Sequence, residues 1–319
     1  MLLTIVSQII YFILSVFCQI FDPILLWSVL RKRFSSRTNQ PFVYIAFLTC
    51  MGFYGKPALV AMIDVLPVAN LIDPENGYES YRQFIGRPMT LAGTHAYLTA
   101  VCLNFLMTVH RVWVVLKPFD TKMFSESRLA IYCGVIWTLL LISLLIPMFS
   151  PCYLNYDARV LSFVAACAPD RHPITLFQNK YSIYVPMISM VINFAIIFHM
   201  KFRRMKDNSA TSLSSQNAKR DRENGMILQA AAIACYLSVY ELVNLYIRLF
   251  PEAYGLIPEE VRYCLMCIRV FSACSLNFFI YFVVTKSTRQ LVLQLLGLEG
   301  KPKSRQITVN VSSTLVGSS

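Results

Sequence analysis

The sequence contains few charged residues. Of its 319 residues, 14% are charged and 56% are hydrophobic, whereas a soluble domain usually carries about 25% charged residues. A large hydrophobic core does not account for this deficit, because the surface of a soluble protein must still be covered. The composition therefore predicts that lipid, rather than water, surrounds most of the chain.

Acidic residues are scarcer than basic ones. The chain has 17 aspartates and glutamates against 29 lysines and arginines, and its net charge is +12. Such an excess of positive charge can attract nucleic acid. Here, however, the basic residues lie in short loops between apolar runs, which is the pattern that orients membrane proteins. We therefore expect a lipid bilayer, and not nucleic acid, as their partner.

Motifs for metal binding and catalysis are lacking. The four histidines are dispersed along the chain, and no HExxH sequence occurs. One CxxC, at Cys264 and Cys267, has no second pair at zinc spacing. Most of the ten cysteines lie inside apolar runs, where they behave as small hydrophobic residues. These patterns argue against an enzyme embedded in the membrane, and we expect no metal and no cofactor.

Long apolar runs, by contrast, are abundant. A helix needs roughly 20 apolar residues to cross the hydrocarbon core of a bilayer. Seven stretches are long enough, which predicts an all-α membrane protein, a bundle of seven transmembrane helices. The runs are continuous rather than alternating in polarity, which excludes a transmembrane barrel. The expected spans are about 2–30, 41–66, 89–116, 129–150, 181–200, 225–250 and 261–285.

The residues after the seventh run predict a short amphipathic helix. Within 286–298, Leu291, Leu295 and Leu298 fall on one helical face, and basic residues cluster at the start of the segment. We expect residues 1–298 to form one seven-helix domain with this helix at its end. Residues 299–319 are expected to form a flexible cytoplasmic tail.

The distribution of basic residues predicts the orientation. The loops after the first, third and fifth runs, together with the tail, carry twenty of the 29 lysines and arginines, whereas the opposite loops carry six. Lysine and arginine accumulate in cytoplasmic loops. We therefore expect a multi-pass protein of the plasma membrane, with its N-terminus outside the cell and its C-terminus in the cytoplasm.

Several short motifs occur in order along the runs. The third run ends in "HRVWVVLKPF", where Arg111 is followed seven residues later by a proline. The fourth run has Trp137 and, ten residues on, Pro147, the fifth has Pro186, and the seventh reads "NFFIY" from residue 277. Together they resemble rhodopsin-like G-protein-coupled receptors. The runs "IPMFSPC" and "ACAPDRHPITLFQNKY" are similar to nematode serpentine chemoreceptors, in particular serpentine receptor class XA.

This resemblance implies a chemosensory receptor that binds an extracellular ligand, with a small molecule favoured, and signals through a heterotrimeric G protein. Arg111 resembles the arginine that contacts the G protein when the helices open. His110, Asn277 and Tyr281 match other positions of that coupling region. A neuropeptide receptor of the same superfamily is the near alternative, and a ligand-gated channel or an intramembrane enzyme is a more distant one.

The sequence departs from the family pattern at several positions. His110 takes the place of the acidic residue that restrains the resting state in the family. Asp22 stands where the first helix usually has asparagine and Thr49 where the second has aspartate, so the carboxylate has moved to a neighbouring helix. The resemblance implies an inner polar network of Asp22, Thr49 and Asn277, and leaves open whether sodium binds there. Gly86 replaces the third-helix cysteine, which puts the family's bridge to the outer loop in doubt.

Charged residues within the runs have two interpretations. In the first, Lys56, Glu241 and Arg269 are polar anchors of an outward-opening ligand pocket, which Tyr97 and Tyr240 help to line. In the second, the charges form internal salt bridges, because three cations and three acids within the runs cancel. The residues of this second interpretation are Lys56, Arg248, Arg269, Asp22, Asp64 and Glu241.

Two cysteines, Cys152 and Cys167, lie in one expected extracellular loop. Because that compartment is oxidising, a disulfide between them is one expectation. A bridge from either of them to Cys264, near the outer end of the seventh run, is the alternative.

Overall fold

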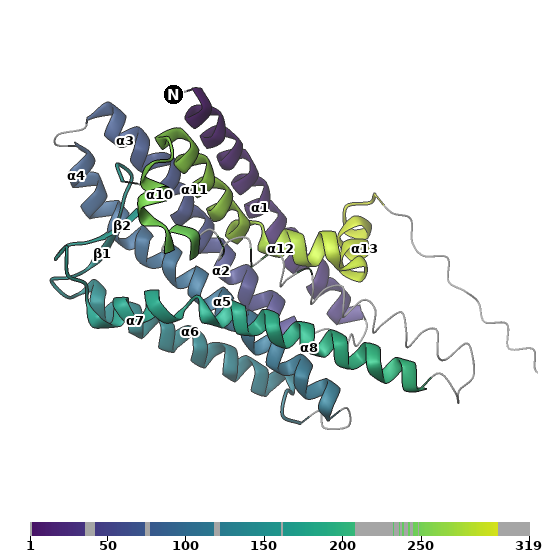
Figure 1. The fold of residues 1–319 in the computed structure, drawn as a ribbon. Coiled ribbons are helices and arrows are strands. Elements are labelled where there is room, and N and C mark those ends of the chain that lie inside the picture. Colours follow the sequence, from purple (N-terminus) through teal and green to yellow (C-terminus); the bar gives the residue numbers. More distant parts are fainter. Residues whose placement is uncertain are drawn as a thin grey trace, which may run out of the picture.

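The computed structural model describes residues 2–35, 42–73, 77–117, 122–160, 162–207 and 249–298, together with single positions between 232 and 247. In these residues the chain forms a bundle of long helices with one β-hairpin (Figure 1). The hairpin lies at one end of the bundle, which we call the hairpin end. We call the opposite end, where the long helix α5 stops, the Arg111 end. The architecture confirms the predicted all-α membrane protein.

The helices follow the apolar runs of the sequence. Five of the helices in the described residues are long and apolar enough to cross a membrane. A sixth span results when Glu259–Cys274 is joined to Leu276–Val284, which is bent from it by 53°. The expected run 225–250 lies largely outside the described residues. The elements are α1 (Leu2–Ser35), α2 (Phe42–Val60), α3 (Leu66–Ile72), α4 (Gly77–Tyr81), α5 (Arg87–Leu116), α6 (Glu126–Met148), α7 (Pro173–Tyr181), α8 (Tyr184–Asp207), α10 (Pro251–Gly255), α11 (Glu259–Cys274), α12 (Leu276–Phe278) and α13 (Lys286–Leu295).

Two π-helical segments let helices continue through prolines. The segment η1 (Ala61–Val65) joins α2 to α3, and η2 (Arg82–Gly86) joins α4 to α5. Each ends two residues before a proline, Pro67 or Pro88. A proline lacks the N–H and clashes with the carbonyl four residues earlier, and a wider turn relieves both problems. The helices therefore extend into residues 67–88, where the sequence had suggested a loop.

The hairpin consists of β1 (Leu154–Asp157) and β2 (Ser162–Ala165), which pair antiparallel with Tyr156 opposite Phe163. A disulfide joins Cys152 to Cys167 and closes the loop around the two strands. The sequence analysis did not predict these strands. They place Tyr156, which is 1% exposed, in the apolar cluster of the hairpin end, together with Tyr11, Met62 and Tyr263.

Side-chain exposure follows a membrane pattern. Large apolar residues such as Ile13, Trp27 and Leu139 are about 60% exposed on the outside of the bundle, where lipid would cover them. Inside, a second apolar cluster around Leu25 and Tyr44 fills the Arg111 end. Continuous apolar exposure of this extent would be unfavourable in water, so the structure agrees with the composition.

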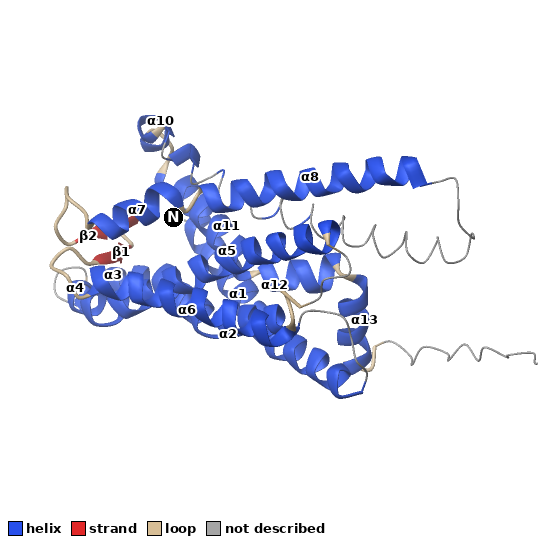
Figure 2. Ribbon diagram, turned by 90° about the horizontal axis from the view of Figure 1, so that it is seen from below, coloured by secondary structure: helices blue, strands red, loops and turns tan. Residues whose placement is uncertain are grey.

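The helix α13 lies across the end of the bundle, against α1 and the π-helical segment η3 (Phe279–Val284) (Figure 2). Its buried residues are Thr288 and Val292, which are 0% and 1% exposed. Leu291 and Leu295 are half-buried, and Leu298 is 74% exposed. The helix therefore packs against the bundle through the face that carries Thr288 and Val292.

Candidate functional site

A buried ion pair joins the first two helices. Lys56 donates to Asp22 Oδ2 at 2.6 Å and to the carbonyl of Cys18 at 2.9 Å. The two charged side chains are 6% and 0% exposed. Asn277 lies on the other side of the carboxylate and donates to Asp22 Oδ1 at 3.3 Å and to the Leu48 carbonyl at 3.3 Å. Asp22 thus has partners on both oxygens, as a buried charge requires.

This arrangement brings together residues that the sequence analysis had assigned to different sites. Asp22 and Asn277 meet, as expected for the inner polar network, but their third partner is Lys56. Lys56 forms an internal salt bridge with Asp22, as the second interpretation of the buried charges describes. Thr49, the residue after Leu48, is fully buried, but its hydroxyl has no hydrogen-bond partner among the described residues. The Lys56 ammonium supplies the positive charge next to the Asp22 carboxylate.

The backbone of α2 comes close to this pair because residue 52 is glycine. A Cβ at Gly52 would lie 2.1 Å from Asp22 Oδ2, and a Cβ at Gly55 would lie 2.4 Å from the Ala96 side chain. The absence of a side chain at these positions lets α1 and α5 pack closely on α2.

We expect Gly52→Ala to lower the thermal stability of the purified protein. The new methyl group would displace the Asp22 carboxylate from Lys56, and such overpacking costs about 1–3 kcal/mol. Differential scanning fluorimetry in detergent measures the effect. Gly134→Ala is the control, because a Cβ there meets nothing within 4 Å, and alanine is the better helix former by about 1 kcal/mol. Equal melting temperatures for the two variants would contradict the prediction.

Two cavities lie along α5. The inner one is lined by Lys56, Asn277 and Tyr236, and so borders the buried ion pair. The outer one, at the hairpin end, is lined by Arg87 and Arg269 and by α7 residues including Gln178. Tyr97, Gly93 and Leu59 border both cavities. Of the expected pocket residues, Tyr97 and Arg269 therefore line the outer cavity, Lys56 lines the inner one, and Tyr240 and Glu241 lie outside the described residues.

The Arg111 end contains a second group of functional candidates. The Arg111 guanidinium contacts Met107 Sδ at 3.7 Å and lies close enough to Tyr44 and Tyr281 for electrostatic interaction. His110 stacks on Phe124, with ring centroids 4.6 Å apart. Among the described residues, Arg111 is in no salt bridge, consistent with the histidine that replaces the family's acid. Tyr281 thus lies near Arg111, whereas Asn277, four residues earlier, contacts Asp22.

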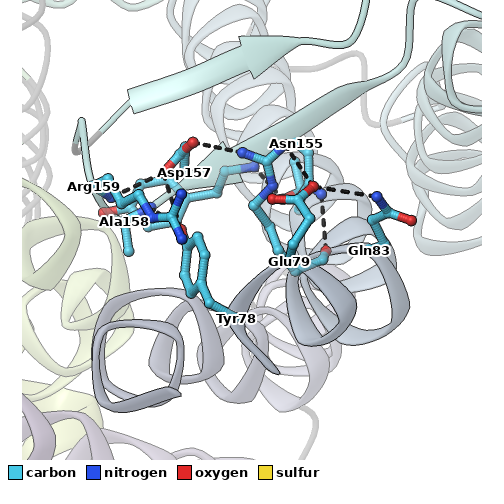
Figure 3. A network of polar contacts seen from close by, with 10 residues as sticks. Tyr78, Glu79, Gln83, Asn155, Asp157, Ala158 and Arg159 are labelled. Carbon is cyan, nitrogen blue, oxygen red and sulfur yellow. Dashed lines mark hydrogen bonds and ion pairs between the residues drawn. The ribbon is translucent and has the colours of Figure 1, made fainter. Parts of the chain in front are cut away.

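A polar network binds the hairpin to the start of the third span (Figure 3). Arg82 donates to Asp157 Oδ2 at 2.5 Å, and its other terminal nitrogen lies 3.3 Å from Glu79. The Tyr78 hydroxyl donates to Asp157 Oδ1 at 3.0 Å and accepts from the Ala158 N–H at 2.8 Å. The two acidic residues of this network are therefore both paired with Arg82.

Gly86 explains how the hairpin can come so close to the helix. A Cβ at this position would lie 3.2 Å from Asn155 Oδ1, and the Asn155 amide donates to the Arg82 carbonyl at 2.9 Å. One turn further along, the Thr90 hydroxyl accepts from the Tyr156 N–H at 3.0 Å. Burial raises the pKa of Tyr156, so its hydroxyl stays protonated at physiological pH. Polar contacts thus fasten the hairpin at the position where the resemblance implied a missing disulfide.

The sequence analysis missed Arg82, Arg87, Asn155 and Asp157. The two arginines were counted only as charges of the outer loops. Arg82 and Arg87 are five residues apart, and Pro88 and a long apolar run follow them. Because proline is common in the first turn of a helix, this pattern could have placed both arginines at a helix start. Asn155 and Asp157 carry no comparable signal, because their role depends on the register of the hairpin.

Asp64 is a further buried acid. It lies in η1, is 9% exposed, and neither carboxylate oxygen has a hydrogen-bond partner among the described residues. Its surroundings include Tyr263 and Cys267. The Tyr263 hydroxyl donates to the neighbouring Ile63 carbonyl at 2.9 Å rather than to the carboxylate. The second interpretation of the buried charges therefore holds for Asp22 and Lys56 but not for Asp64 within the described residues.

Together, these features define a multi-pass helical membrane protein with a cavity at one end and an arginine without an acidic partner in the described structure at the other. The family model described as "Caenorhabditis serpentine receptor-like protein, class xa" matches residues 39–194. "Serpentine receptor class XA 10" of Caenorhabditis elegans is 32% identical over an alignment 255 positions long, which covers 74% of this chain and 76% of that protein. The chain belongs to the nematode serpentine receptors of class XA, and the predicted family is confirmed.

Proposed function

We propose that this protein is a chemosensory G-protein-coupled receptor of the plasma membrane. Its hairpin end faces the outside and binds a small-molecule ligand in the outer cavity, and its Arg111 end faces the cytoplasm and a heterotrimeric G protein. Membership of the serpentine receptor family supports a receptor role. The excess of lysine and arginine at the Arg111 side supports the orientation.

One observation carries this proposal: a single helix connects the two ends. The helix α5 begins at Arg87 and contributes Thr90, Thr94 and Tyr97 to the outer cavity. Twenty-four residues after Arg87, the same helix carries Arg111. A ligand that binds better to one position of α5 would shift the population of receptors toward that position, and the shift would reach Arg111 through the rigid helix.

The proposal is tested by expressing the chain in cells with a cAMP or calcium reporter and screening small metabolites. We expect at least one small molecule to produce a response that disappears when the Gα subunits of the host cell are deleted. A response that persists without Gα subunits, or an ion current in its place, would contradict coupling to a G protein.

The position of His110 beside Arg111 gives a separate prediction. We expect His110→Asp to lower basal signalling several-fold, because a carboxylate next to the guanidinium would stabilise the resting position of Arg111 by charge pairing. The measurement is the basal reporter signal at matched surface expression. His110→Asn is the control, because asparagine has the length of aspartate but no charge. An unchanged basal signal in His110→Asp would count against a resting state that lacks an acidic lock.

A further inference from the structure

The outer cavity has an unusual charge. Its two charged lining residues among those the structure describes are both arginines, Arg87 and Arg269. Two acids at this end of the bundle, Glu79 and Asp157, pair with Arg82. We propose that this cavity binds a small carboxylic acid, as its carboxylate, with an apolar body. This inference rests on the proposed ligand cavity and names the chemistry of its ligand.

Arg87 is held in place as an anion-binding group. One terminal nitrogen donates to the carbonyl of Met148, the last residue of α6, where the partial negative charge of the helix end favours a cation. The guanidinium lies over the Tyr153 ring, 4.1 Å from its centroid. These two contacts fix the plane of the guanidinium without neutralising its charge.

A donor of Arg87 without a protein partner indicates a ligand. Its Nε is buried and has no hydrogen-bond partner among the described residues. A buried donor without a partner is unfavourable, and a charged one more so. A carboxylate is the complementary acceptor, because its two oxygens match the fork of N–H groups on a guanidinium. A neutral ligand would satisfy the donor but not the charge, and an amine would be repelled.

The rest of the lining selects the body of the ligand. The walls include Leu91, Leu144 and Phe163, and the neutral polar residues include Thr94 and Asn179. Cavities of this kind bind small molecules that bury an apolar body and direct one or two polar groups to fixed partners. The empty space is about 1010 Å³, including the part open to solvent. It is large enough for an aryl or short alkyl acid.

The test uses three probes of similar size and different charge: phenylacetate, 2-phenylethanol and phenethylamine. Binding is measured as the shift in melting temperature of the purified full chain in nanodiscs, titrated with each probe. We expect phenylacetate to raise the melting temperature, and the alcohol and the amine to have little effect. The proposal would be overturned if the alcohol or the amine stabilised the chain as much as the acid does. It would also be overturned if none of the three probes stabilised it.

Variants identify the group that binds the acid. We expect Arg87→Gln to weaken the binding of phenylacetate about tenfold or more, as for the loss of a charge-assisted hydrogen bond, and Arg87→Lys to have an intermediate effect. Arg171→Gln, at an exposed position between β2 and α7, should bind like the wild type. Unchanged binding in Arg87→Gln would overturn the assignment. If that variant does not fold, the comparison of Arg87→Lys with Arg171→Gln decides in the same way.

The failure of this inference and that of the proposed function give different results. Binding to the purified chain requires no G protein. Binding of the acid without any Gα-dependent response in cells would contradict the proposed function only. A Gα-dependent response to neutral or cationic compounds, with no stabilisation by acids, would contradict the ligand class only.

Discussion

Replacing Lys56 by methionine is expected to prevent most of the receptor from reaching the cell surface. The variant keeps the length and packing of the side chain but removes the ammonium that lies 2.6 Å from Asp22. Among the described residues, the fully buried carboxylate would then keep only its contact with Asn277. Removing one partner of a buried ion pair costs about 3–5 kcal/mol, which is a large part of the stability of a folded domain.

The double variant Asp22→Asn with Lys56→Met separates this effect from a general loss of packing. It removes both charges, so it should recover most of the surface expression and the melting temperature that the single variant loses. Lys180→Met, at an exposed position, is the control for the loss of a lysine. Normal expression of Lys56→Met would mean that Asp22 needs no counter-ion, and would contradict the assignment of this pair as a stabilising contact between α1 and α2.

Replacing Arg111 by glutamine is expected to lower signalling tenfold or more while leaving the receptor at the surface. In the structure Arg111 has no salt bridge among the described residues, and its polar contact is a thioether 3.7 Å away. Its loss should therefore cost little stability. The expected loss of G-protein activation is tenfold or more, because a charge-assisted contact to the partner is worth about 1.5–3 kcal/mol. Nucleotide exchange on purified G protein, at equal receptor amounts, measures it.

Lys117→Gln is the matched control for Arg111→Gln. This lysine ends the same helix, is exposed, and lies over the ring of Trp113 at 4.6 Å. Its replacement removes the same charge from the same end of the bundle. We expect at most a small change in exchange rate. Equal losses in the two variants would show that total charge at this end, rather than Arg111 itself, supports coupling.

Much of the fold could be predicted from the sequence because the bilayer imposes it. A span needs a continuous apolar run of a given length, so the runs that contain Leu25 and Leu139 identify their helices without any knowledge of packing. The family resemblance rested on short motifs around Arg111, Trp137 and Pro147, which can be recognised within single apolar runs. The comparison with class XA receptors confirms it.

The π-helical segments and the hairpin could not be predicted in this way. Whether Pro67 or Pro88 ends a helix or passes through a widened turn depends on the neighbouring elements that hold the chain on course. The strand Leu154–Asp157 is four residues long and is stabilised by contacts to Arg82 and Thr90, which lie some 65 to 75 residues earlier. Such contacts leave no periodic pattern in the sequence.

The site was predicted in parts, and the parts were grouped differently. Asp22, Lys56 and Asn277 were all identified as unusual polar residues in apolar runs. Their pairing depends on how α1, α2 and α12 rotate about their axes, and the spacing of residues within one helix does not fix the rotation of another. The sequence therefore indicates that the charges cancel in sum, but not which acid pairs with which cation.

The most direct test of the proposed signalling direction is the position of the two chain ends. Epitope tags added before residue 1 and after residue 319 are stained with antibodies on intact and on permeabilised cells. The account predicts that the N-terminal tag is stained on intact cells, whereas the C-terminal tag is stained only after permeabilisation. Staining of both tags on intact cells, or of neither, would place both ends on one face of the membrane and contradict it.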